Sequence, residues 1–107
     1  MTDRELLEMA AKAAAYEIKE HPNRKFFGDL LFIYRRANWN PLADDGDALR
    51  LAVELKFEIF CGEDQSEVKD YEQTFVIIEE HKDHESPVSA TRRAIVRAAA
   101  EIGKEMP

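Results

Sequence analysis

The first part of the chain alternates apolar and polar residues with the period of an amphipathic helix. Thr2 and Glu5 have the three-residue spacing of a capping box, which satisfies free backbone N–H groups in a first helical turn. The apolar residues that follow are mostly alanine and recur at helical spacing: Leu6, Ala10, Ala13, Ala14 and Ile18. We expect this helix to end near Glu20, because Pro22 disfavours helical geometry at His21.

Residues 30–34 (LLFIY) show a different pattern, since they are apolar without interruption. An unbroken run of aromatic and branched side chains predicts a strand that is buried on both faces. Such a strand lies at the centre of a sheet or is covered by helices on both sides.

The middle of the chain carries the clearest helix start. Residues 38–41 favour a turn, and we expect Trp39 to pack its ring over the edge of the core. Asp44 or Asp45 can then cap a helix, with Asp47 in its first turn at the positive end of the helix dipole. The apolar face of this helix consists of Leu49, Leu51, Ala52, Val53 and Leu55.

Two further strands are predicted in the second half. Residues 56–61 alternate, so that Cys61 and Ile59 share one side of a strand. Residues 71–80 have the composition of another strand, and residues 62–70 form a hairpin-like connection or a mobile loop. Because so short a connection cannot make a parallel crossover, the two strands are expected to be antiparallel.

The last helix is expected to start at Ser86 with Pro87 in its first turn, or at Ser89. Its inner stripe consists of Ala90, Thr91, Ala94, Ile95, Ala98, Ala99, Ile102 and Met106. Gly103 is expected to weaken the end of this helix.

The expected order is therefore α-β-α-β-β-α in a single domain that spans residues 1–107. We predict an α/β (α+β) layered helix/sheet/helix sandwich with a small three-stranded sheet, in which alanine-rich helices pack on both faces of the sheet.

Composition narrows the function classes. The net charge of −7 argues against unspecific binding to nucleic acid or to anionic membranes. No apolar run approaches the roughly 20 residues that a membrane span needs. Residues 1–5 lack the features of a signal peptide, and Cys61 is the single cysteine, so we expect a cytoplasmic protein.

Three stretches resemble a known family. These are residues 39–42 (WNPL) followed by residues 44–53 (DDGDALRLAV), residues 91–103 (TRRAIVRAAAEIG) and residues 1–8 (MTDRELLE). They are similar to segments of the phage ABA-sandwich domain family, which comprises small phage and prophage proteins. The resemblance implies helix, sheet and helix layers, a phage or prophage origin, and a host bacterial cell as the location. It brings no established reaction and no catalytic residues.

Candidate catalytic and metal-binding residues each have a structural explanation. Asp44, Asp45 and Asp47 could bind a divalent cation, but they lack the ligand spacing of a calcium loop, and helix capping accounts for all three. His81 and His84 lie among carboxylates, yet a zinc or nickel site would need ligands from a second segment, so a solvated loop is the better interpretation.

A catalytic thiol would need a neighbouring base, and we expect Cys61 to be a buried structural thiol instead. The chain has no nucleophile elbow and no glycine-rich phosphate loop. We therefore expect a protein that has no catalytic activity, cofactor or bound metal.

Two groups of charged residues are candidates for binding. Acidic residues around the last two strands could dock on a basic partner: Glu63, Asp64, Glu67, Asp70, Glu79, Glu80, Asp83 and Glu85. Arg92, Arg93 and Arg97 lie on one exposed sector of the last helix and could hold phosphate, although a solvated face with Arg97 paired to Glu101 is the simpler interpretation.

These observations support two hypotheses. The first is a phage accessory protein that binds a host protein or nucleoprotein complex, for example to block a host immune nuclease or effector. The second is a small-molecule or nucleotide-binding domain that uses the arginines or the helix N-terminus after Asp45. Three aspartates at that terminus repel phosphate, which favours the first hypothesis.

Overall fold

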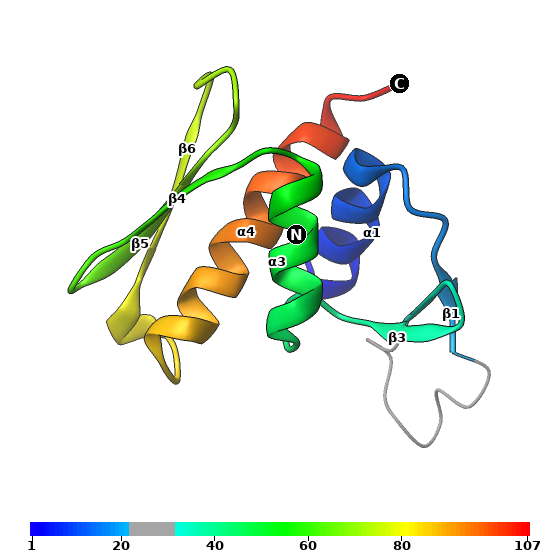
Figure 1. Cartoon of the computed structure of the whole chain (residues 1–107), viewed down its shortest axis with the longest axis horizontal. Helices are drawn as coiled ribbons and strands as arrows, with labels where there is room; N and C mark the ends of the chain where they lie inside the picture. The colour runs from blue at the N-terminus through cyan, green and yellow to red at the C-terminus, as the bar shows by residue number, and fades with distance from the viewer. Residues whose placement is uncertain (22–31) are drawn as a thin grey trace.

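The computed structural model describes residues 1–21 and 32–107. Its elements follow the order α1 (Asp3–Ala14), β1 (Lys19–Glu20), β2 (Phe32–Tyr34), β3 (Ala37–Trp39), α3 (Asp45–Glu54), β4 (Glu58–Cys61), β5 (Gln65–Lys69), β6 (Val76–Glu80), the 3-10 turn η1 (His81–Asp83) and α4 (Pro87–Lys104). The strands form two antiparallel sheets, β1-β2-β3 and β4-β5-β6, at opposite ends of the view in Figure 1.

The helices lie between the two sheets, with α4 at the centre. Both α1 and α3 pack on α4, and α4 covers one face of the β4–β6 sheet (Figure 1). The buried positions of α1 and α4 are mostly alanine: Ala10, Ala11, Ala14, Ala90, Ala94, Ala98, Ala99 and Ala100. Gly103 lies so close to α1 that a Cβ there would be 2.0 Å from the carbonyl oxygen of Met9. This glycine permits the close approach of the two helices.

Helix α1 begins where the sequence predicted but ends earlier than expected. The capping box of Thr2 and Glu5 is present, which confirms the predicted start. The helix ends at Ala14 and not near Glu20, because Ala15 adopts a left-handed conformation (φ 60°) and its N–H donates to carbonyls of the last turn. Residues 19–20 pair with β2 instead of continuing the helix.

The small β1–β3 sheet brings aromatic side chains to the core. β2 is its central strand, and a central strand is one of the two positions that the apolar run of residues 30–34 predicted. Residues 30 and 31 lie outside the described part of the chain. The rings of Tyr16 and Tyr34 stack at 4.2 Å, and Trp39 meets Tyr16 edge-on at 6.1 Å. Trp39 is only 3% exposed, so it belongs to the core and not to its edge.

The predicted cap of α3 is confirmed and extended. The backbone N–H of Asp47 donates to Asp44 Oδ2 (2.8 Å), while Asp47 Oδ2 accepts from the N–H of Asn40 (2.9 Å) and its Oδ1 from Arg50 (2.9 Å). Asp47 therefore joins the helix to the turn before it. The start of α4 is confirmed as well, with Ser86 as N-cap and Pro87 in the first turn.

The mixed α+β class and the single compact body agree with the sequence-based prediction. The arrangement of layers differs from it in two respects. The strands form two sheets instead of one, because residues 19–20 and 37–39, expected as a helix end and part of a turn, pair with β2, while β5 occupies most of the segment predicted as a loop over residues 62–70 and joins β4 and β6. All described helices lie on one side of the β4–β6 sheet, so no helix among residues 1–21 and 32–107 covers its other face. Within the described part of the chain, no helix combines the length and apolar character that crossing a membrane requires.

Candidate interaction surface

The uncovered face of the β4–β6 sheet carries large apolar side chains. In the register of the sheet, Phe60, Glu67 and Ile78 lie side by side, and so do Glu58, Lys69 and Val76. Phe60 is 60% exposed, Val76 44% and Ile78 43%. We call this surface the outer face: Glu58, Phe60, Gln65, Glu67, Lys69, Val76, Ile78 and Glu80. It carries apolar side chains on β4 and β6, on either side of a polar central row from β5, and most of its charges are acidic.

The charges on the outer face are only partly neutralised. Glu80 pairs with Lys82 (3.3 Å), whereas Glu58 accepts from Nε2 of Gln73 (2.5 Å), a neutral amide that leaves the charge of Glu58 in place. Lys69 is the single cation within the outer face, against three carboxylates. The face is therefore complementary to a basic surface that also carries apolar side chains.

One end of the sheet adds further acids. Glu63 and Asp64 form the two-residue β4–β5 turn, and the N–H of His81 donates to the carbonyl of Asp64 (2.9 Å). Glu80 lies beside them around a shallow depression of about 290 Å³. The exposed Asp83 and Glu85 follow in η1 and the segment after it. The structure thus gathers most of the predicted acidic residues at this end.

Asp70 and Glu79 do not belong to that surface. Asp70 is 8% exposed and accepts hydrogen bonds from the N–H and hydroxyl of Thr74 (2.7 and 2.5 Å) and from the N–H of Phe75 (3.2 Å). Burial acts to raise the pKa of Asp70, but these hydrogen bonds outweigh it and lower the pKa. Asp70 shapes the β5–β6 turn, and Glu79 points to the opposite face, toward α4.

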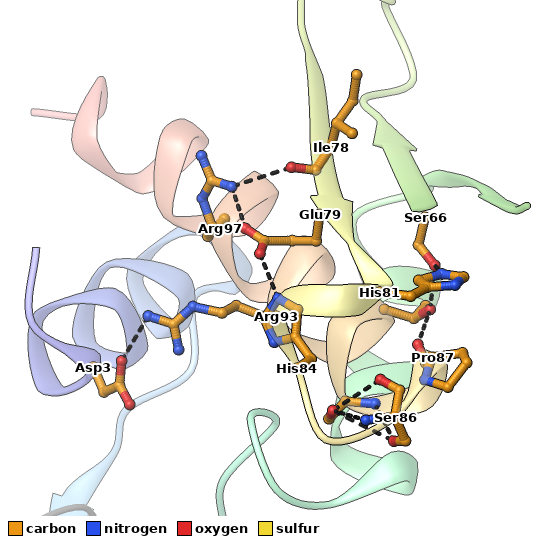
Figure 2. A network of polar contacts seen from close by, with 12 residues as sticks. Asp3, Ser66, Ile78, Glu79, His81, His84, Ser86, Pro87, Arg93 and Arg97 are labelled. Carbon is orange, nitrogen blue, oxygen red and sulfur yellow. Dashed lines mark hydrogen bonds and ion pairs between the residues drawn. The ribbon is translucent and has the colours of Figure 1, made fainter. Parts of the chain in front are cut away.

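Glu79 lies in a polar cluster between β6 and α4 (Figure 2). Its carboxylate bonds both Arg97 and the Nε2 of His84 (2.6 Å). Burial acts to raise the pKa of Glu79, but the hydrogen bonds and charges of Arg97 and His84 outweigh it and lower the pKa. These contacts connect β6 to α4.

Each of the three candidate arginines is tied to a different element. Arg92 donates to the carbonyl of Leu42 (2.9 Å) and pairs with Asp45 (2.6 Å). Arg93 pairs with Asp3 at the start of α1 (2.8 Å; Figure 2). Arg97 pairs with Glu79 of β6. The three side chains therefore connect α4 to its surroundings and do not form one solvated sector. Glu101 pairs with Lys104 (3.0 Å) and not with Arg97 as expected.

A buried hydroxyl network was not predicted. Ser66 Oγ lies 2.9 Å from His81 Nε2 and 2.6 Å from Thr91 Oγ1, while His81 Nδ1 lies 3.1 Å from the carbonyl of Glu63. Ser66 is fully buried, so this serine and histidine do not present a nucleophile to solvent. Like His84, His81 is held by specific bonds and does not lie in a solvated loop. Only the alternating pattern around Val68 could have indicated that Ser66 points inward.

Cys61 is exposed, contrary to the buried thiol that we expected. Its side chain points toward the helices, as predicted, but α4 covers β5 and β6 and leaves β4 open. Beside β4 lies an apolar groove of about 380 Å³. Its lining includes Leu49, Ile59, Cys61, Val88 and Ile95.

Among residues 1–21 and 32–107, no three His, Cys, Asp or Glu side chains are grouped so that they could hold a metal ion. Comparison with known protein families, with characterised proteins and with solved structures found no match to this chain.

Proposed function

We propose that this protein acts by binding a basic surface of a protein or nucleoprotein partner through its outer face. The observation that carries the proposal is the exposed group of Phe60, Val76 and Ile78 on a sheet face that no described element covers. Large exposed apolar side chains grouped among polar ones mark interaction sites in soluble proteins. An exposed aromatic residue such as Phe60 is typical of the residues that dominate binding energy.

The acidic residues supply the second half of the argument. Glu67 lies between Phe60 and Ile78, Glu58 and Glu80 lie on the same face of β4 and β6, and Glu63 and Asp64 extend the negative surface at one end of the sheet. Complementary charge speeds encounter and selects the partner, while desolvated apolar contacts hold the complex. A partner is therefore expected to present apolar side chains interspersed with lysine and arginine.

The resemblance to phage proteins suggests a concrete version of this function. A host immune nuclease or effector has a basic groove for nucleic acid, and an acidic sheet face could occupy it. In that version the protein works in the cytoplasm of the host cell and blocks the groove without catalysis.

The nucleotide-binding alternative has less support. Arg92, Arg93 and Arg97 all engage carboxylates of the protein itself, so phosphate would have to displace these ion pairs. The groove next to Arg92 is lined mainly by apolar side chains, which suit neither phosphate nor ribose.

Capture from bacterial lysate tests the proposal when variants are compared in parallel. The double variant Phe60→Thr/Ile78→Thr removes an exposed apolar side chain from each side of the outer face and keeps residues that favour strands. Val53→Ala is the control, because Val53 is also an exposed apolar residue but lies on α3. The wild type and the control are expected to retain a common basic protein that the double variant loses, with retention that falls as salt rises. Equal retention by all three proteins would contradict the proposal.

A further inference from the structure

The groove beside β4 borders an open sheet edge. The sheet order is β4-β5-β6, so among the strands that the structure describes β4 pairs with β5 alone. All four residues of β4 are exposed, including Ile59 and Phe60. Natural proteins usually protect such edges with proline, lysine, a bulge or a covering segment. Residues 58–61 (EIFC) contain no proline or lysine, and Glu58 is their one charged residue.

The hydrogen-bond register shows which backbone groups face that edge. The N–H of Gly62 donates to the carbonyl of Gln65 (2.9 Å), so these two residues form a hydrogen-bonded pair of the hairpin. Hydrogen-bonded and non-hydrogen-bonded pairs alternate along an antiparallel ladder. Cys61 and Ile59, opposite Ser66 and Val68, are therefore in non-hydrogen-bonded positions. Within the described chain, their N–H and C=O groups point to the free edge.

The same two residues face the groove with their side chains. Ile59 and Cys61 line one wall, Leu49 of α3 lines the other, and Val88 and Ile95 of α4 complete it. Leu49 is 61% exposed and Val88 51% exposed. A strand added to β4 would place alternate side chains in this groove and the intervening ones on the outer face.

The charged residues at this edge indicate which side chains an added strand would carry. Glu58 lies on β4, and Glu63 and Asp64 follow at its end, whereas Lys56 is the cation that precedes it. A second copy of this acidic chain would bring like charges together. A segment with lysine or arginine between its apolar residues would be complementary.

We propose that the β4 edge and its groove bind an extended segment of a protein partner, with apolar side chains at alternate positions and basic side chains between them. The segment adds a fourth strand to the sheet and fills the groove with its inward side chains. This inference deepens the proposed function, since the ligand is again a basic protein. It uses a surface next to the outer face and can fail separately.

A matched pair of substitutions isolates the edge. Cys61→Pro removes a backbone N–H that faces the free edge but leaves the ladder to β5 intact, since proline is tolerated on edge strands. Cys61→Ala changes the side chain and keeps the N–H. Val88→Asp places a charge in the groove at a helix N-terminus, where it suits the helix dipole, with Val53→Asp as its control.

Short random peptides displayed for selection against the wild-type protein provide the ligand. Synthetic copies of the enriched peptides are then titrated calorimetrically against each variant, after amide spectra confirm that the variants fold. Alternating apolar and basic sequences are expected, with binding to Cys61→Pro about tenfold or more weaker than to Cys61→Ala. Val88→Asp is expected to weaken binding by a similar factor, and Val53→Asp to leave it unchanged.

Other outcomes would overturn the inference. These are an absence of enriched peptides, enriched peptides without alternation, and equal affinity for Cys61→Pro and Cys61→Ala. Peptides that lose affinity only in Phe60→Thr/Ile78→Thr would place binding on the outer face alone, which supports the proposed function but not the edge. A wild-type dimer that Cys61→Pro abolishes would assign the edge to a second copy. Should Cys61→Pro not fold, unchanged binding to Val88→Asp would be decisive against the inference.

Discussion

Replacing Gly103 with alanine is expected to destabilise the fold, even though alanine is the better helix former. Gly103 is buried in the last turn of α4, against the backbone of α1. A Cβ at this position would lie 2.0 Å from the carbonyl oxygen of Met9 and 2.8 Å from its carbonyl carbon. Since Cβ atoms essentially never approach another heavy atom closer than 3.0 Å, the two helices would have to separate by about 1 Å.

The magnitude follows from this displacement. Inserting a methyl group into a well-packed interior costs about 1–3 kcal/mol, and a rigid carbonyl as the neighbour places this case at the upper end. A gap of about 1 Å also forfeits up to roughly half of the dispersion energy of the contacts that it opens. Alanine regains about 1 kcal/mol in helix propensity, which leaves a net loss of about 2 kcal/mol. For a domain of this size, Tm should fall by about 8 °C.

Circular dichroism during thermal and urea unfolding measures this loss, with Gly46→Ala as the control. Gly46 lies in the first turn of α3, and a Cβ there would meet the flexible end of Arg50 and the capping oxygen of Asp44 at 3.1–3.2 Å, so each has to move by only a few tenths of an ångström. Gly46→Ala should therefore match the wild type or exceed its stability by up to about 1 kcal/mol. If the Gly103→Ala variant is as stable as the wild type, the close approach of α1 and α4 is refuted.

Three further predictions test other parts of the structure. Asp47→Ala should lower the free energy of unfolding in urea by about 1–3 kcal/mol, because it leaves the part-buried backbone N–H of Asn40 without its acceptor. Asp45→Ala removes only an exposed ion pair with Arg92 and should lower it by about 1 kcal/mol or less. The folded pKa of Glu79 is lowered, so its stabilisation is present above the ordinary carboxyl pKa of about 4.3 and is lost as pH falls through the folded value. The difference in unfolding free energy between wild type and Glu79→Gln should thus shrink on acidification, and a constant difference would contradict the cluster with Arg97. Finally, Cys61 should react with a thiol reagent in the native protein about as fast as in urea, and strong protection would contradict its exposure.

Local signals in the sequence predicted the element starts well. The capping residues Thr2, Asp44 and Ser86 all cap the helices that they were expected to cap. A cap depends on atoms within three residues, so the sequence contains the whole interaction. The left-handed turn at Ala15 has no such signal, because alanine does not favour that conformation, and the end of α1 was predicted too late.

Properties that depend on distant contacts could not be predicted in this way. Alternation placed Cys61 on the inner side of its strand, but its exposure depends on α4 covering β5 and β6 instead of β4. Arg93 pairs with Asp3 across nearly the whole chain, a contact that sequence spacing cannot show. Gly103 resembled a weak helix end until the position of Met9 gave it a packing role. The acidic end of the sheet was predicted because its residues are close together in the sequence.

The most direct test of the proposed function is the dissociation constant of the captured partner for the wild type and for Phe60→Thr/Ile78→Thr, measured by calorimetry at one salt concentration. Loss of a central aromatic contact typically costs about 2 kcal/mol or more, so the double variant should bind about 30-fold or more weakly. Val53→Ala should bind as the wild type does. Equal dissociation constants for the wild type and the double variant would contradict binding through the outer face.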